Sequence, residues 1–453
     1  MAKLRELLES LIIELRRTQS PNAFPEKVGG KTVMSGWVSA GDGGSLMLSR
    51  AMEKLIADIA KVLKQNGTRL ELTHTDQEWK DLVRTSLGPP LASIDLSDDD
   101  GRNAESVLAA LREQLFSEQT LSDREHTFGC SLFAKDFPSF SIGPVVFAPR
   151  LEWLEREENE GHIDGLTARR VRRRWLGEKL RKRKSVADAM FEDDIIATIG
   201  ECRYVCSVRT DGLAPQAAQQ KAQVAVRLAL TAIALSWEVP SGALSGFRLL
   251  IDGGVRIQLN LVFRKGFRSF AGRTMKGRPN GPPISEVDWL RVLETRRDEF
   301  GVTGEAIAYY LDPAGHAARP KLMNVFAQSL LWFHEACREE VDMLAIVKFA
   351  ASLDALASGG EINGISKLIN ARLGVSLDQK LFNNGQTVRE ALKDIYSNGR
   401  SRTIHGTNDK FGYDWQSTRH NAEILSRLCL ILCLDHASRF QSDDPTSLST
   451  PQS

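Results

Sequence analysis

The sequence lacks any long uninterrupted hydrophobic run. Its first residues, MAKLRELLESLIIELRRTQ, place charged side chains among the apolar ones, so no secretory leader with a continuous apolar core is predicted. The longest apolar region, residues 222–237, is interrupted by Gln223, Arg227 and Thr231, and a membrane span needs about 18 apolar residues in succession. We therefore expect a cytoplasmic protein that does not associate with membranes.

The chain also lacks a large excess of charge and any CxxC cysteine pair. With 59 basic and 58 acidic residues its net charge is +1, so nucleic-acid binding would have to come from local clusters of cations. Cys429 and Cys433 are four apart on a predicted helix, and Cys202 and Cys206 are four apart on a predicted strand. Each pair shares a face and could supply half of a zinc site, but small buried thiols are the favoured interpretation. We expect no metal and no cofactor.

The length and the hydrophobic patterns indicate an α+β multidomain protein. A chain of 453 residues corresponds to two or three domains at about 150 residues each. The pattern mixes helices and strands in the first 321 residues and becomes entirely helical after them. The predicted parts are a mixed helical N-terminal region at 1–139, an α+β domain with a basic helix and a β-hairpin at 140–321, a C-terminal all-α bundle at 322–441, and a polar, disordered tail at 442–453.

A glycine-rich turn, GDGGS at residues 41–45, precedes a predicted amphipathic helix at residues 45–64. Such a turn at a helix start can hold a phosphate on its backbone amides. However, no GxxxxGK[ST] motif follows and no clear apolar strand precedes it. The favoured interpretation is a flexible turn in which Ser45 is the helix N-cap.

The central region predicts two strands and a basic helix. FSIGPVVFA, residues 140–148, has the pattern of a strand, and residues 202–208 alternate as on a half-buried strand. Residues 168–184 hold ten Arg or Lys against one Glu, which predicts a basic helix. This helix could follow a nucleic-acid backbone, but we slightly favour a solvated helix paired with the acidic residues 152–160.

The clearest predicted hairpin joins residues 247–252 to residues 255–263 through Gly253 and Gly254. In its second strand Val255, Ile257, Leu259, Leu261 and Phe263 lie on one face. The segment that follows, residues 265–283, is basic and rich in glycine and proline. It predicts a long loop, either a domain boundary or a flap over a substrate.

Helical spacing of apolar residues dominates the C-terminal part. Gly374 is predicted to end one helix, and Thr387 with Glu390 forms a capping-box signature for the next. The short connections between helices favour an antiparallel bundle. The predicted helices cover residues 326–338, 343–356, 362–373, 387–396 and 420–440.

Between the last two helices, IYSNGRSRTIHG at residues 395–406 contains Arg400 and His405. Histidine can move a proton near neutral pH, and arginine can stabilise negative charge on a phosphorus-centred transition state. RNA carries its own nucleophile, the 2′-hydroxyl, so a metal is not required. Five positions rotate about 140° around an α-helix, so the two side chains do not share one face. The arginine side chain is long enough to curl round, and Gly399 and Gly406 can loosen the backbone locally. The alternative is an Arg–His contact that stabilises a helical hairpin.

The R-x4-H pair, with Tyr396, Ser401 and Gly406 around it, resembles the HEPN superfamily and most closely its Apea-like branch. The resemblance covers residues 336–440, and residues 142–154 are similar to N-terminal regions that accompany this branch. It implies a HEPN-like bundle and a metal-independent endoribonuclease that acts in bacterial antiviral or stress defence. It also implies a homodimer, formed through the bundle, that leaves 2′,3′-cyclic phosphate ends on the RNA.

By this resemblance Arg400 and His405 are the candidate catalytic residues, and Arg402 and Ser401 are candidates for substrate binding. Many active members carry Asn, Asp or His directly after the arginine, whereas this chain has Ser401, which can still donate and accept a hydrogen bond. Asp354, on an earlier helix, would orient His405 if the two helices face each other.

Other functions also fit the sequence. The upstream region could hold the nuclease inactive or respond to a regulatory protein partner. The main alternative is a non-catalytic RNA-binding or interaction protein, with the bundle as a dimerisation module and residues 168–184 and 265–278 contacting phosphates. A third, weaker alternative is a helical partner that neutralises a toxin.

Overall fold

The computed structural model describes residues 2–20, 23–24, 26–29, 31–33, 36–65, 72–116, 121, 123–253, 255–312, 315, 317–382 and 385–451. The chain is mixed α/β, with many helices, small sheets and a helical C-terminal region. Contacts divide it into two compact units, unit 1 (Met1–Arg124 with Thr210–Gln220) and unit 2 (Glu125–Arg209 with Lys221–Ser453). This division differs from the four parts expected from the sequence, because residues before and after 321 belong to the same compact unit.

Unit 1 packs four long helices around one apolar core. The stripe expected in the first helix is buried there through Leu8, Leu11 and Leu15. Its helices are α1 (Ala2–Thr18), α2 (Arg50–Gln65), α4 (Asp76–Ser93) and α5 (Asp100–Phe116), and its short strands are β1 (Glu26–Val28), β2 (Lys31–Val33), β3 (Gly36–Ser39) and β4 (Ser45–Leu48).

The glycine-rich turn connects two strands and does not open a helix, contrary to the sequence-based prediction. β3 pairs antiparallel with β4, and Ser45 faces Ser39 in the register. Gly41 and Gly43 have φ of +93° and +87°, which glycine adopts without strain. The following helix α2 begins only at Arg50, and the Ser49 hydroxyl accepts its Met52 N–H at 3.1 Å. Ser45 is therefore not an N-cap, and the turn does not open onto a helix N-terminus that could bind a phosphate.

Unit 2 contains a five-stranded sheet in the order β6-β7-β8-β5-β9. Residues 140–148, expected as one strand, form the hairpin of β6 and β7, which turns at Gly143 with φ +55°. The strands are β5 (Arg124–Ser131), β6 (Phe140–Ile142), β7 (Val145–Pro149), β8 (Tyr204–Thr210) and β9 (Arg248–Leu249).

Both faces of the central strand β8 are covered, so it is not the half-buried strand that the sequence predicted. Cys206 belongs to the same apolar cluster as Ala222 of α9 (Pro215–Ala234). Val205 points into a second cluster with Trp153 of α6 (Arg150–Asn159) and Ile199 of α8 (Val186–Ile199). The sheet therefore lies between α9 on one side and the smaller group α6 to α8 on the other.

The basic segment forms a helix only in its first half. α7 (Gly165–Trp175) ends at Trp175, and residues 176–184 are not helical. Its arginines pair mainly with the helix that follows: Arg170 lies 2.7 Å from Glu192 and Arg174 lies 2.6 Å from Asp193 of α8. Only a 3.9 Å approach of Arg172 to Glu158 reaches the acidic block ahead of it. The expected charge pairing is therefore present but largely with different acids.

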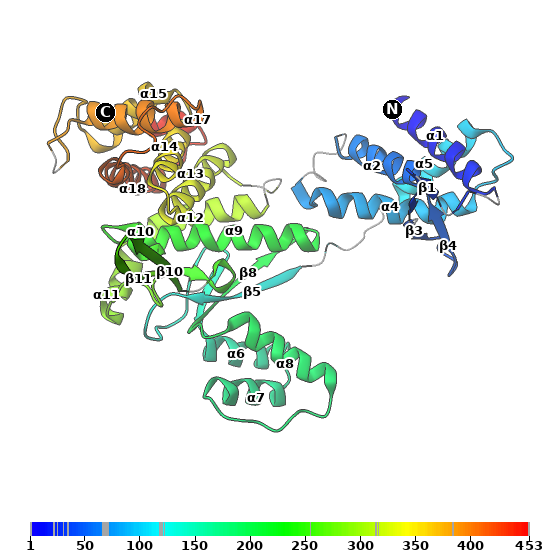
Figure 1. The fold of residues 1–453 in the computed structure, drawn as a ribbon, viewed down its shortest axis with the longest axis horizontal. Helices are drawn as coiled ribbons and strands as arrows, with labels where there is room; N and C mark the ends of the chain where they lie inside the picture. Colours follow the sequence, from blue (N-terminus) through cyan, green and yellow to red (C-terminus); the bar gives the residue numbers. More distant parts are fainter. Residues whose placement is uncertain are drawn as a thin grey trace. The chain divides into compact units, whose positions relative to one another are not determined.

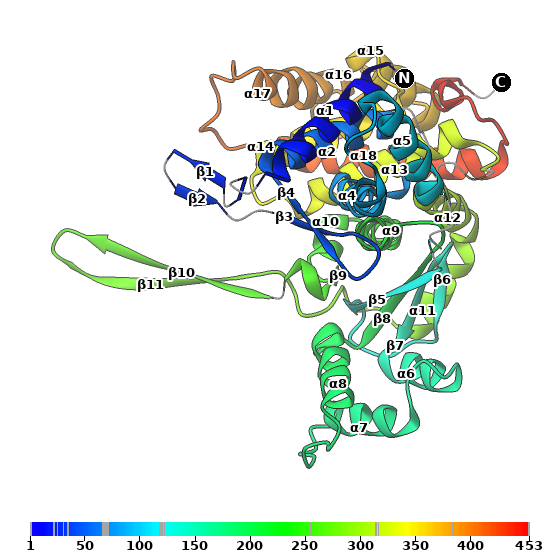
Figure 2. The ribbon, with the colours of Figure 1, turned by 90° about the vertical axis from the view of Figure 1, so that its right-hand side faces the viewer.

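The predicted hairpin at residues 247–263 is wrong. β9 pairs with β5 and is followed by a 3-10 turn, Leu250–Asp252; Gly254 lies outside the described residues. The second predicted strand, β10 (Arg256–Arg264), pairs forward with β11 (Phe267–Lys276), within the segment expected to be a loop. Together β10 and β11 form a long two-stranded ribbon that projects from unit 2 (Figure 2).

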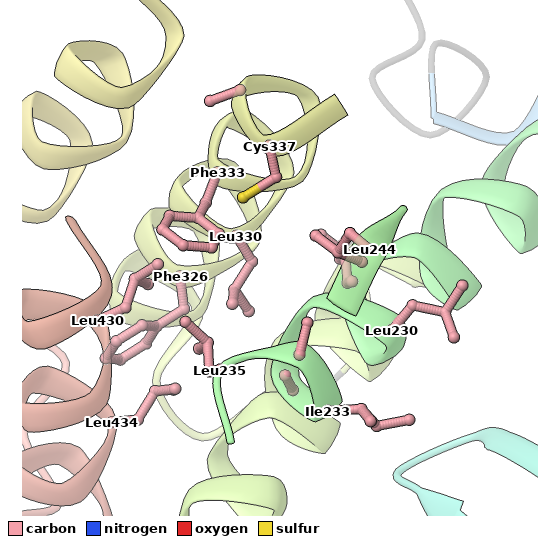
Figure 3. Close-up of a cluster of buried hydrophobic side chains, with 14 of the residues drawn as sticks. Leu230, Ile233, Leu235, Leu244, Phe326, Leu330, Phe333, Cys337, Leu430 and Leu434 are labelled. Atoms are coloured by element: carbon pink, nitrogen blue, oxygen red, sulfur yellow. The ribbon is translucent and has the colours of Figure 1, made fainter. Parts of the chain in front are cut away.

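The C-terminal helices share one core with the sheet layer. Leu230 of α9, Leu244 of α10 (Pro240–Leu244), Phe333 of α13 and Leu430 of α18 belong to a single cluster (Figure 3). The helices are α11 (Glu286–Thr295), α12 (Arg297–Leu311), α13 (Pro320–Arg338), α14 (Asp342–Leu356), α15 (Glu361–Leu373), α16 (Val388–Leu392), α17 (Arg402–Ile404) and α18 (Gln416–Arg439), with a π-helix η2 (Lys393–Ser401) between α16 and α17. The predicted end of α15 at Gly374 is confirmed by its φ of +66°.

The polar C-terminal segment packs on the protein and is not disordered over residues 442–451. A 3-10 helix, η3 (Pro445–Ser449), buries Leu448 completely. The Arg372 guanidinium donates hydrogen bonds to the carbonyl oxygens of Leu448 at 2.8 Å and Ser447 at 3.1 Å. Leu448 is the apolar residue that attaches this segment, and the polar composition around it gave no sign of this role in the sequence.

Among the described helices, none is by itself long and apolar enough to cross a membrane. Taken together, α14 and α15 pass a test of length and composition as one pair, bent by 67°.

A close approach of two glycines joins α12 to the β6–β7 turn and leads to the first prediction. A Cβ built on Gly304 would lie 2.7 Å from the Gly143 Cα, which is too close without a backbone shift. Gly304→Ala is expected to lower the free energy of unfolding by about 1–3 kcal/mol in denaturant titration. Gly301→Ala on the same helix meets no atom within 4 Å and should be neutral or stabilising; equal losses in both variants would contradict the packing argument.

Candidate functional site

Arg400 lies in the π-helix η2, which continues α16 without a break. The predicted capping box starts α16, because the Glu390 N–H donates to the Thr387 hydroxyl at 3.3 Å and the Thr387 N–H donates to Glu390 Oε2 at 2.9 Å. The chain then widens to the π geometry, which recurs at functional sites in helices. No local pattern in the sequence predicts this change of helix type.

Gly399 lets the π-helix approach α14 closely. A Cβ at this position would lie 2.6 Å from Ile346 Cγ2 and 3.0 Å from the Asp394 carbonyl oxygen. Only glycine fits there without movement of the π-helix or of Ile346. This contact fixes the backbone next to Arg400.

The contact at Gly399 predicts that Gly399→Ala lowers the free energy of unfolding by about 1–3 kcal/mol in denaturant titration, because the methyl group overpacks the core. Gly412→Ala, in the loop before α18, meets no atom within 4 Å and serves as the control. If both variants unfold at the wild-type denaturant concentration, the close packing of η2 on α14 is wrong.

The Arg400 side chain is held between an aromatic ring and a carboxylate. Its guanidinium carbon lies 4.7 Å from the centre of the Tyr396 ring, and its Nη1 donates a hydrogen bond to the Tyr396 hydroxyl. Its Nη2 lies 3.2 Å from Asp354 Oδ2 on α14. Burial, together with the nearby Asp354 carboxylate, raises the pKa of the Tyr396 hydroxyl, so this group stays a neutral phenol. Because arginine has five N–H donors, donors remain for a phosphate.

A cavity of about 410 Å³ adjoins Arg400. It opens between α13, which contributes Gln328 and Trp332, and α14, which contributes Asp354. The Asp354 Oδ1 atom is buried without a hydrogen-bond partner among the described residues, and Trp332 is 44% exposed. Gln328 and Trp332 were not among the residues predicted from the sequence. With Val325, which also lines the cavity, they recur at helical spacing, and a tryptophan beside a glutamine on one helix face was the available signal.

His405 stands at the C-terminal end of α17 and is exposed. The Gly406 N–H donates to the Thr403 carbonyl at 3.2 Å and the Thr407 N–H donates to the Arg402 carbonyl at 2.8 Å. With Gly406 at φ +69°, these bonds form the Schellman motif that ends a helix. The glycine after His405 therefore stops the helix and leaves the imidazole at its edge, facing solvent.

The loop after His405 is tied back to the π-helix by Asn408. The Asn408 amide donates to the Thr403 hydroxyl at 3.0 Å and to the Asn398 carbonyl at 3.3 Å. Arg402 forms an exposed ion pair with Asp409 at 3.2 Å. Ser401 is half-buried in the π-helix. These contacts keep residues 400–409 as one small, ordered surface.

The structure brings together some of the predicted residues and not others. Arg400 meets Asp354, a pairing that the sequence assigned to His405. Within the described residues, His405 has neither a side-chain hydrogen bond nor an ion pair, and it does not line the cavity beside Arg400. A contact between Arg400 and His405 that holds a helical hairpin is therefore not what stabilises this region.

The cysteines are separate from this site. All six are free; Cys429 and Cys433 are buried on α18, and burial raises the pKa of the Cys433 thiol to about 12. Burial likewise raises the pKa of the Cys429 thiol. In the described parts of the chain one group of three residues has metal-ligating atoms close together, within 4.8 Å, and it comprises Glu157, Glu160 and His162 near α6.

Comparison of the chain with protein-family models, with curated proteins and with solved structures found no significant match.

Proposed function

We propose that the protein is a metal-independent endoribonuclease of the HEPN type, an effector of bacterial antiviral or stress defence that works as a homodimer. In it, Arg400 and His405 act on a scissile phosphate, and Arg402 and Ser401 help to hold the RNA. The proposal rests on the resemblance of residues 395–406 to that superfamily and on the geometry of the two side chains.

In the proposed reaction the ribose 2′-oxygen attacks the adjacent phosphorus and the bond to the 5′-oxygen breaks. One imidazole accepts the 2′-hydroxyl proton, and an imidazolium returns a proton to the leaving 5′-oxygen. Arginine stabilises the extra negative charge on the phosphoryl oxygens. The products are a 2′,3′-cyclic phosphate and a 5′-hydroxyl, and no metal takes part. A dimer supplies two imidazoles, one for each proton transfer.

The observation that carries the proposal is the contrast between the two residues. Arg400 is oriented by Tyr396 and Asp354 and lies at the edge of a cavity, whereas His405 is exposed at a helix end and has no side-chain partner in the described part of the chain. A structural pair would satisfy both side chains within the chain. A fixed cation and an unpartnered imidazole, five residues apart in the chain, suit the binding and cleavage of a phosphodiester.

The surface around His405 also suits a second subunit. Ile404, Phe411 and Tyr413 are 58%, 67% and 68% exposed. Exposed apolar side chains grouped beside polar ones mark interaction sites. Packing of this surface on its copy would place two R-x4-H pairs in one cleft.

The test is an RNA cleavage assay with purified protein and excess EDTA. We expect endonucleolytic products that carry 2′,3′-cyclic phosphate ends, at a rate unchanged by the chelator. A requirement for added Mg²⁺ or Mn²⁺, or products with 5′-phosphates, would contradict the proposed chemistry.

A second candidate, a non-catalytic RNA-binding protein, is favoured by the basic segment after α7. Lys179, Arg181 and Lys182 line a cavity of about 550 Å³, and within the described residues these three side chains form no ion pair. Such cations bind phosphates with strong salt dependence. This candidate predicts that Lys179→Ala with Lys182→Ala lowers RNA affinity, whereas His405→Ala leaves it unchanged and no RNA is cut.

A further inference from the structure

The two-stranded ribbon of β10 and β11, residues 256–276, is called the arm. One face of the arm carries large apolar side chains that no described residue covers. Ile257, Leu259, Leu261 and Phe263 are 68%, 66%, 66% and 75% exposed, and Met275, which pairs with Ile257, is 65% exposed. Alternation along a strand places the four β10 residues on one face. Monomeric proteins rarely expose so continuous an apolar strip.

The arm is also strongly cationic. Its sequence contains six Arg or Lys and no Asp or Glu, while the rest of the chain holds more acidic than basic residues. Two arms would therefore repel each other, which argues against arm-to-arm pairing. Phosphates of a nucleic acid would satisfy the cations but would offer no apolar surface to Leu259 and Leu261. The arm requires a surface that is both apolar and acidic.

The helix α8 offers such a surface in the same chain. Val186, Met190 and Phe191 are 71%, 62% and 45% exposed. Val186, Met190 and Asp194 follow one another at four-residue spacing along one row of the helix. Asp194 is exposed and forms no ion pair within the described residues. α8 has 14 residues, about 21 Å, and the apolar strip from Ile257 to Phe263 is about 20 Å long.

A cavity of about 420 Å³ continues the surface of α8 toward the sheet. Phe191, Ile195 and Trp153 give it apolar walls. Of its acidic residues, Glu125 and Glu157 are paired with Arg156, and Asp194 has no ion pair among the described residues. The Trp153 Nε1 atom is buried without a hydrogen-bond acceptor among the described residues. The tip of the arm, with the aromatic Phe263 and the cationic Lys265, matches the apolar walls of this cavity and its acidic Asp194.

We propose that the arm of one chain packs on α8 and its adjoining cavity in a second copy of this protein. The apolar face of β10 lies on Val186, Met190 and Phe191, and the basic tip meets Asp194. In the dimer each chain gives its arm and receives the partner's, so the contact is reciprocal. This contact is a second interface, formed by other residues than the surface around His405, and its test does not use RNA cleavage.

The test exchanges charges across the contact in the full-length protein and measures the masses of assemblies by native mass spectrometry. Lys265→Asp places like charges at the contact in one variant, and Asp194→Lys does so in the other. Each variant alone is expected to lose the assemblies that need the arm contact, because its self-association through this contact is at least 10-fold weaker than in wild type. In a mixed dimer, the altered arm with Lys265→Asp meets the altered helix with Asp194→Lys, and the unaltered arm meets the unaltered helix. Both contacts then join opposite charges. Mixed dimers should therefore exceed the 1:2:1 statistical distribution.

Apolar variants provide the second measurement, by sedimentation equilibrium. Leu259→Ser with Leu261→Ser, and separately Met190→Ser, should each weaken association at least 10-fold, while Val287→Ser, at an equally exposed valine of α11, should leave it unchanged. All these side chains are exposed, so folding is retained. Wild-type association in the arm and α8 variants, or a statistical distribution in the mixture, overturns the proposal. Loss of RNA binding or of binding to anionic vesicles in the arm variants, with association intact, also overturns it.

Discussion

Replacing His405 by alanine is expected to lower the rate of RNA cleavage by about 10²–10⁴-fold, the range that a positioned proton-transfer group contributes. The imidazole is exposed and has no side-chain partner among the described residues, so its removal leaves no buried group unsatisfied. RNA affinity and thermal stability should therefore stay close to those of wild type. The measurement is single-turnover cleavage of a labelled RNA in EDTA, with a filter-binding titration beside it.

The matched control is His420→Ala, at an exposed histidine near the start of α18. It removes one imidazole from the same helical region without touching residues 395–406. Wild-type rates are expected for this variant. If His405→Ala cleaves as fast as His420→Ala, His405 is not the proton-transfer group, and the non-catalytic RNA-binding function becomes the better account.

Arg400→Ala is expected to lower the cleavage rate by about 10²–10³-fold, as does the loss of one donor that stabilises a developing oxyanion. It also leaves Asp354 without its cation. Because the Asp354 side chain is only 20% exposed, we expect a loss of stability, of about 1–3 kcal/mol, smaller than for a fully buried pair. A rate measured on Arg400→Ala alone therefore mixes catalysis with folding.

The double variant Arg400→Ala with Asp354→Asn separates the two effects. Removing both charges should recover most of the stability in denaturant unfolding, while cleavage stays as slow as in Arg400→Ala. Arg389→Ala, which removes an exposed arginine of α16 that pairs with Asp378, should match wild type in both measurements. Recovery of cleavage in the double variant would show that Arg400 has only a structural role.

Local signals in the sequence predicted the helical C-terminal region well. Thr387 with Glu390 and the glycine at 374 are short-range signals, because a cap depends on residues within one turn. The apolar spacing that predicted α14 also holds, since Ile346, Phe349 and Leu353 are all buried. Each of these features is decided by neighbours along the chain.

Features that depend on distant partners were not predictable in the same way. The Gly253-Gly254 pair resembles a hairpin turn, but β9 is held by β5, more than a hundred residues earlier, and β10 pairs forward with β11. Gly266 and Gly272 made β11 look like a loop. The sequence predicts a helix at residues 45–48 because the apolar residues there continue directly into those of α2. Their pairing with β3 depends on tertiary structure and not on the local pattern.

The candidate site shows the same division. The sequence pointed to Arg400 and His405 through their spacing and resemblance to a family. It could not show that Asp354 faces Arg400, that Trp332 borders the cavity, or that the backbone forms a π-helix. These properties arise where α13, α14 and η2 pack together. In the sequence, the only trace of this packing is that residue 399 is a glycine, which has no side chain.

The most direct test of the central claim uses two substrates of one sequence, an RNA and the same RNA with every 2′-hydroxyl methylated. If the RNA supplies the nucleophile, wild-type protein in EDTA cuts the first and leaves the methylated strand intact, although it binds both. Cleavage of the methylated strand would show that water or a protein group attacks the phosphate, and the proposed roles of Arg400 and His405 in activating the ribose would be contradicted.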